Sequence, residues 1–130
     1  MPLSQFIKSE DFKKEKHVPV IEAPDKVKAS EKVEITVTVG KEIPHPNTTE
    51  HHISWIKLFF QPDGDPYVYE VGNYEFSSHG ATVKGPNTGA VYTEPIIKTT
   101  VKLSLSGTLI ALSYCNIHGL WESSKRIAIE

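Results

Sequence analysis

The stretch VEITVTVG, residues 33–40, alternates apolar and polar side chains without interruption. Its four aliphatic residues would share one face of an extended chain, because successive residues of a strand point to opposite sides. Gly40 then supplies a residue that commonly ends such a run. This stretch predicts a half-buried β-strand and sets the period of two that most of the chain follows.

Six further segments are predicted as strands, and turns rich in glycine and proline separate them. They are residues 17–21, 51–61, 67–76, 95–106, 108–115 and 126–129. Apolar side chains fall on both faces of 51–61, which predicts a central strand covered on both sides. Helical spacing occurs at residues 3–8 and supports a short N-terminal turn. The seven strands and the N-terminal turn together predict one domain, residues 1–130, folded as a seven-stranded antiparallel immunoglobulin-like β-sandwich.

Composition narrows the classes of function. The 130 residues carry a net charge of −2, so that neither the basic patch of a nucleic-acid-binding protein nor that of a membrane-surface protein is expected. No apolar run approaches the length of a membrane-spanning helix, and residues 1–15 lack the apolar core of a signal peptide. The single cysteine forms no intramolecular disulfide. We therefore expect a cytoplasmic protein in a reducing compartment.

Histidine is unusually frequent, and five of the candidate metal ligands lie in three short stretches. These are Glu15-Lys16-His17, residues 44–52, and Cys115-Asn116-Ile117-His118-Gly119. A Cys-x-x-His turn after a strand lets a thiolate and an imidazole reach one ion. Backbone amides that follow the cysteine can also point at its sulfur, which tunes a metal thiolate.

The middle stretch offers three histidines. Pro44 and Pro46 bracket His45 and restrict its backbone, which would hold the ring in place before a metal arrives. His51 and His52 alternate across a strand, so only one of them can face a given site. We expect His51 to be the ligand and His52 to support it or lie at the surface. His79 receives no role.

A set of four imidazoles and one thiolate indicates which metal is expected. Structural zinc closes at four ligands, and blue copper uses an axial methionine, whereas the only methionine here is Met1. Iron suits the set, because an axial thiolate can donate electron density to it. A cupredoxin-like electron carrier and a β-sandwich binding module with structural zinc are the alternatives. Neither gives His17 or the Glu15–Lys16 pair a purpose.

At these residues the sequence resembles the small superoxide reductases with a single iron centre, the neelaredoxin-like kind related to the iron centre II domain of desulfoferrodoxin. The resemblance spans essentially the whole chain and rests on EKHVP (15–19), HPNTTEHH (45–52) and CNIHG (115–119). It implies one mononuclear iron per chain, Fe2+ or Fe3+, with Glu15 as a possible sixth ligand in the ferric state. The implied ligands are four equatorial histidines and an axial cysteine: His17, His45, His51, His118 and Cys115.

The resemblance also implies an activity, in which superoxide is reduced to hydrogen peroxide and no dioxygen is released. Rubredoxin is the implied electron donor, and a homotetramer is the implied assembly. Because the protein is slightly negative, an anionic substrate needs a local attraction, and Lys16 beside a ligand can supply it. Glu15, a hard oxygen donor, would prefer Fe(III) and leave on reduction.

Overall fold

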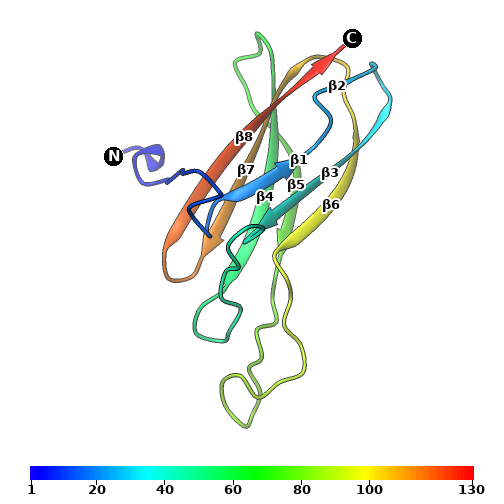
Figure 1. Cartoon of the computed structure of the whole chain (residues 1–130). Helices are drawn as coiled ribbons and strands as arrows, with labels where there is room; N and C mark the ends of the chain where they lie inside the picture. Colours follow the sequence, from blue (N-terminus) through cyan, green and yellow to red (C-terminus); the bar gives the residue numbers. More distant parts are fainter.

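Two β-sheets lie face to face in the computed structural model, which describes residues 1–130 (Figure 1). A single turn of 3-10 helix, η1 (Leu3–Gln5), precedes eight strands. The strands are β1 (Pro19–Glu22), β2 (Lys26–Val27), β3 (Lys32–Val39), β4 (Ile53–Pro62), β5 (Tyr69–Glu75), β6 (Ile96–Lys102), β7 (Gly107–Cys115) and β8 (Gly119–Ile129). The β-sandwich and the short N-terminal turn expected from the sequence are confirmed.

The smaller sheet has the order β1-β3-β6 and the larger one β2-β8-β7-β4-β5. Every pairing is antiparallel except that of β2 with β8, which is parallel, so the prediction of a purely antiparallel fold is wrong at this edge. Strand β2 was missed because two residues cannot show an alternation. The last strand is also longer than predicted, because serine and charged residues within β8 hide its pattern.

Strand β4 differs from its prediction in the direction of one side chain. Alternation from Trp55 would place Ile53 on the outer face, but a register shift between these two residues turns Ile53 into the core beside Ile56 and Leu58. The outer face of β4, which includes Trp55 and Phe59, is only half-buried. The prediction that both faces are covered is therefore wrong, although β4 does lie inside its sheet.

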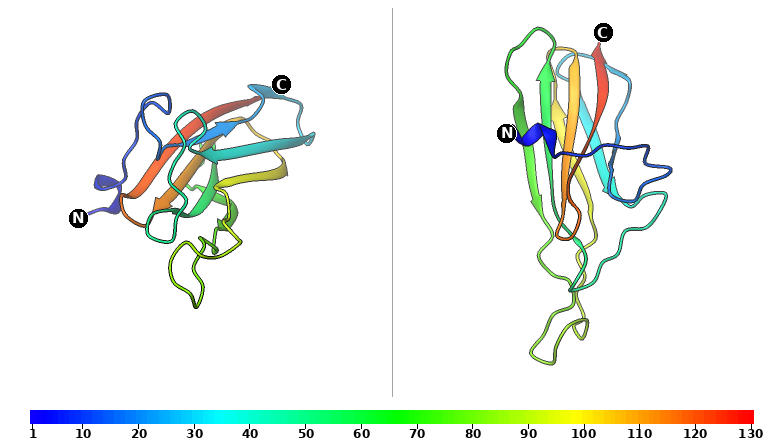
Figure 2. Two further views of the ribbon diagram at one scale, coloured as in Figure 1. Left: turned by 60° about the horizontal axis from the view of Figure 1, so that its bottom comes forward. Right: turned by 90° about the vertical axis from the view of Figure 1, so that its left-hand side faces the viewer.

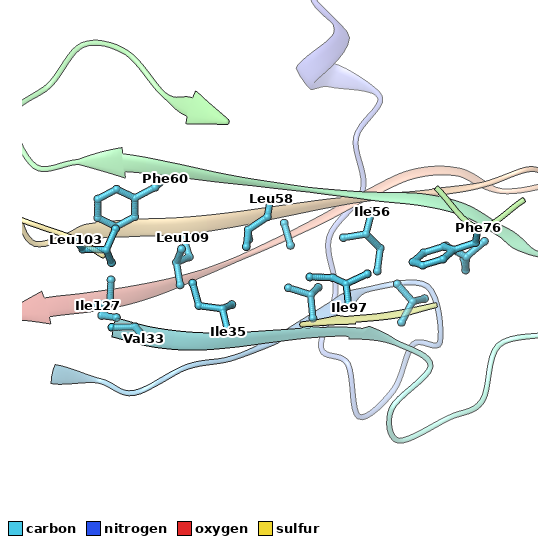
Figure 3. Close-up of a cluster of buried hydrophobic side chains, with 14 of the residues drawn as sticks. Val33, Ile35, Ile56, Leu58, Phe60, Phe76, Ile97, Leu103, Leu109 and Ile127 are labelled. Carbon is cyan, nitrogen blue, oxygen red and sulfur yellow. The ribbon is translucent and has the colours of Figure 1, made fainter. Parts of the chain in front are cut away.

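The core fills the space between the two sheets (Figure 3). Strand β3 contributes Val33, Ile35, Val37 and Val39, the four residues whose alternation predicted it. They face Ile56 and Leu58 of β4 and Leu109 of β7, all fully buried. Burying such side chains stabilises the fold by roughly 1.5–3 kcal/mol each, which makes the sandwich a rigid support for its loops.

The strand registers bring three distant parts of the chain to one end of the sandwich. Pro19 at the start of β1 pairs with Val39 at the end of β3, while Ile53 at the start of β4 pairs with Cys115 at the end of β7. The loops 40–52 and 76–95 and the β7–β8 turn lie together at this end, which is the lower one in Figure 1 and is seen from another side in Figure 2.

The outer edge of β8 is covered at both ends by other parts of the chain. Near the β7–β8 turn, Lys8 forms a bridge with Trp121, donating its backbone N–H to Leu120 and accepting one from Glu122. At the far end, β2 pairs with Ala128 and Ile129.

No helix of the structure is long and apolar enough to cross a membrane.

Candidate metal centre

The structure brings all five predicted ligands together at the loop end of the sandwich. The donor atoms of His17, His45, His51 and Cys115 lie within 4.8 Å of one another. His118 joins them through its Nδ1 atom, which is 3.1 Å from His17 Nε2 and 3.8 Å from Cys115 Sγ. Donors separated by about 100 positions in the sequence therefore converge on one volume.

The four imidazole rings form a closed cycle. Centroids of neighbouring rings are 4.7–5.1 Å apart in the order His17, His45, His51, His118. Across the cycle, the rings of His17 and His51 are 6.3 Å apart. Nearly equal sides with a longer diagonal describe a roughly square arrangement, which four separate solvated histidines would have no reason to adopt.

Hydrogen bonds fix which nitrogen of two rings faces the others. His45 Nδ1 donates to the Pro46 carbonyl at 2.7 Å, and His17 Nδ1 donates to Glu15 Oε1 at 2.5 Å. The Nε2 atoms of these rings then carry the free lone pairs. Nε2 of His45 and of His51 is buried with no hydrogen-bond partner. Such unpartnered buried polar atoms are rare in folded proteins, and a cation bound between them would satisfy both.

The thiol of Cys115 is fully buried and accepts a hydrogen bond from the backbone N–H of His118 at 3.3 Å. The tight turn between β7 and β8 produces this contact, because Cys115 pairs directly with Gly119. Gly119 has a φ of +79°, a conformation that side-chain-bearing residues rarely adopt. The glycine of the CNIHG stretch thus closes the turn that aims an amide at the sulfur.

His45 is held against the end of β3. Gly40 has a φ of +84°, and a Cβ atom at this position would come within 2.7 Å of the His45 backbone nitrogen. The glycine that ends the strand therefore also lets the loop fold back closely enough to bring His45 into the cluster.

His17 lies in an irregular segment before β1, and contacts with three residues hold it. Its backbone N–H and its ring both donate to Glu15 Oε1, and its carbonyl accepts from the buried Ser113 hydroxyl at 3.1 Å. The indole of Trp121 stacks on its ring, with centroids 4.9 Å apart. Ser113 and Trp121 were not identified from the sequence, because neither residue type is itself a metal ligand.

His52 and His79 lie outside the cluster and stack on each other, with centroids 3.5 Å apart. His79 Nδ1 and Asn47 Oδ1 lie within hydrogen-bond distance at 2.7 Å, and Thr49 donates to the His79 carbonyl at 2.6 Å. Asn87 on the same long loop also bonds Thr49. The loop that carries His79 therefore braces the loop that carries His45 and His51, a role that the sequence did not indicate.

Burial favours the neutral form of three of the cluster histidines, His17, His45 and His51. It lowers the pKa of His45 to about 4, although the hydrogen bond to Pro46 opposes the shift. Burial likewise lowers the pKa of His17 and of His51, and nearby positive charge, including that of Lys16, lowers both further. Neutral imidazoles are the form that binds metals, so these rings are ready for a cation at pH 7.

The donor set also separates the metal chemistries that the sequence left open. A blue-copper site needs a weak axial methionine, but the only methionine, Met1, is 98% exposed. A structural zinc site closes at four ligands, whereas five donors converge here. Nitrogen-rich coordination with a single thiolate fits iron, and the orphaned nitrogens show that the residues present fit such an ion.

The depressed pKa of His45 makes the metal-free protein sensitive to acid. The unfolded chain takes up a proton near the ordinary value of 6.5, whereas folded His45 does so near 4, so stability falls with decreasing pH between these values. The loss from His45 should reach at most about 3 kcal/mol and level off below pH 4. Denaturant unfolding of metal-free protein between pH 7 and pH 4 measures it. An equal slope in a His45→Gln variant would contradict the assignment.

Comparison with known proteins places this geometry in a family. A family model described as desulfoferrodoxin matches residues 9–124. Neelaredoxin from Megalodesulfovibrio gigas is 52% identical over 130 residues, covering 100% of both chains. Superoxide reductase from Pyrococcus furiosus is 58% identical over 121 residues, covering 93% of this chain and 95% of its own.

The structural comparison agrees. A crystal structure of a superoxide reductase homologue from Thermotoga maritima has 78% sequence identity and a TM-score of 0.98, covering 100% of this chain and 98% of that one. The likeness thus includes sequence, length and the arrangement of every strand. The chain belongs to the desulfoferrodoxin family, among its neelaredoxin-type superoxide reductases.

Proposed function

We propose that this protein reduces superoxide to hydrogen peroxide, taking one electron from an external donor and two protons from solvent. The balanced reaction is O2•− + e− + 2H+ → H2O2. The observation that carries the proposal is the square of four imidazoles beside a buried thiol, with two buried ring nitrogens that have no hydrogen-bond partner. Relatives that carry the superoxide reductase name over nearly their whole length support it.

One iron ion per chain would be held by five donors. These are Nε2 of His17, His45 and His51, Nδ1 of His118, and Sγ of Cys115. Iron bound there would supply the one-electron change between Fe2+ and Fe3+, with the thiolate donating electron density to it. The His118 N–H that points at the sulfur would moderate that donation, because it withdraws charge from the thiolate.

Lys16 attracts the substrate. The protein carries a net charge of −2, so a superoxide anion gains nothing from the overall field. Lys16 adjoins His17, and its positive charge lowers the pKa of three cluster histidines, which supports an electrostatic influence of Lys16 on the site. A charge so placed raises the local concentration of an anion and hydrogen-bonds the bound substrate.

The Glu15 carboxylate can bond either to His17 or to an oxidised metal centre. In this structure its carboxylate accepts from the N–H and the ring of His17, and these bonds hold the pKa of Glu15 below its ordinary value, although burial raises it. The side chain is 24% exposed and sits at the edge of the cluster. We propose that Glu15 would be a further ligand to ferric iron held by these residues, and would stay hydrogen-bonded to His17 with ferrous iron, since carboxylate oxygen prefers the harder ferric ion.

Electrons would enter at the β7–β8 turn, where His118 and Ile117 are exposed. This turn places a ligand at the surface, so a small redox protein can approach within a short distance of the centre. Family resemblance favours rubredoxin as that donor and a homotetramer as the assembly.

Cys115→Ser should remove the visible thiolate-to-iron charge-transfer band of the oxidised, iron-loaded protein, because a hydroxyl cannot replace the thiolate. The absorption spectrum after anaerobic loading and oxidation measures this. Ile117→Ser is the matched control, since it introduces the same residue into the same turn at a 58% exposed position. A Cys115→Ser protein that keeps its colour would exclude the cysteine as a ligand.

Lys16→Ala should slow the reaction with superoxide by several-fold, up to roughly ten-fold at low ionic strength, and flatten its dependence on salt. Pulse radiolysis at several salt concentrations measures both quantities. Lys32→Ala removes the same charge at the start of β3, the far end of that strand from the site, and should keep the parent salt dependence. An unchanged slope in Lys16→Ala would remove this residue from substrate attraction.

Glu15→Ala should leave superoxide reduction largely intact but change the spectrum of the oxidised protein, because the centre then lacks its carboxylate. Glu10→Ala removes an exposed carboxylate from the same segment and serves as the control. The two oxidised spectra are compared with that of the parent. Coincident spectra for the parent and Glu15→Ala would refute the binding of Glu15 to the oxidised centre.

A further inference from the structure

Trp121 is a half-buried residue of β8 that contacts two of the five proposed ligands. Its indole stacks on the ring of His17, with centroids 4.9 Å apart and planes inclined by 14°. Its Nε1–H donates to the carbonyl of His118 at 3.2 Å. The side chain does not belong to the hydrophobic cluster between the sheets, so packing of the core does not account for its position.

The ring of His17 needs support that its other contacts do not give. The torsion that turns an imidazole about its Cβ–Cγ bond has broad energy wells, so a ring held only at its edge keeps rotational freedom. Glu15 and His118 each contact the ring at a single edge atom, and Ser113 contacts only the backbone carbonyl. The indole instead covers a whole face, and aromatic stacking restrains the plane of the ring.

His118 is exposed and lies in a tight turn, so burial does not restrain it. Two hydrogen bonds clamp its backbone. Its N–H donates to Cys115 Sγ, and its carbonyl accepts from Trp121. Loss of the indole N–H would leave the carbonyl end of this ligand unanchored.

We propose that Trp121 is a positioning residue of the metal centre, which sets the plane of His17 and the backbone of His118 together. One rigid side chain thereby couples two ligands that lie 101 residues apart in the sequence. The role rests on the proposed function, since it requires that both histidines bind the same ion. Rings already held in place pay a smaller ordering cost when the ion binds.

Two substitutions separate the contacts of Trp121. Trp121→Phe keeps an aromatic ring over His17 but removes the N–H, whereas Trp121→Leu removes both. Trp55→Phe is the matched control, because the only other tryptophan stacks on Tyr114 and contacts no proposed ligand. Denaturant unfolding of the metal-free proteins shows whether each variant folds.

Titration with Co2+ under anaerobic conditions supplies readouts other than turnover. The Co2+ affinity of Trp121→Leu should fall by roughly 10–100-fold, with Trp121→Phe between this variant and the parent. The thiolate-to-cobalt charge-transfer band should shift in both variants and stay unchanged in Trp55→Phe. In the Trp55→Phe protein, whose sole indole is Trp121, bound Co2+ should quench the fluorescence with one-to-one stoichiometry.

Failure of this role and failure of the proposed function give different results. If the parent binds Co2+ and Fe2+ while folded Trp121→Leu and Trp121→Phe show the parent affinity and band position, Trp121 does not position the ligands. If the parent itself binds neither ion, the proposed function is overturned and the role of Trp121 with it.

Discussion

The buried Nε2 atoms of His45 and His51 have no hydrogen-bond partner, and the surrounding structure keeps them buried. A buried polar atom without a partner destabilises the folded state by about 1–3 kcal/mol. In the metal-free protein, the hydrophobic core has to offset this penalty. The Pro46 carbonyl prevents the His45 ring from turning its free nitrogen outward, and Gly40 brings the loop close enough to bury it. A bound cation removes the penalty, so folding and metal binding favour the same conformation.

The sandwich and its loops divide the work. Strand ends set the positions of Cys115 and of the loops, because their registers are fixed by the core alternation of β3, β4 and β7. The loops are also tied to one another, as the bonds between residues 47–50 and the long loop carrying His79 and Asn87 show. The ligand geometry therefore depends on a network that spans most of the chain.

The sequence predicted the strands that alternate cleanly and the residues whose chemistry is specific. The alternation from Val33 to Val39 predicts β3. The histidine and cysteine stretches are identified by their residue types and their spacing. Features that depend on a partner were not predictable: the register shift that turns Ile53 inward, the two-residue β2, and the contacts of His79. These features arise where tertiary packing overrides a local pattern. A single sequence does not show which distant residues will become neighbours in the folded protein.

Coverage of the β8 edge has a consequence for how copies of the chain meet. An uncovered strand edge exposes a row of backbone donors and acceptors that can recruit a strand from another molecule, the first step of amyloid-like association. Lys8 occupies this edge beside Trp121, and β2 occupies it at Ala128 and Ile129. The N-terminal segment that contains Lys8 and the two-residue strand β2 thus hinder intermolecular β-pairing at this edge. Trimming the first ten residues would expose the end of that edge nearest the metal ligands.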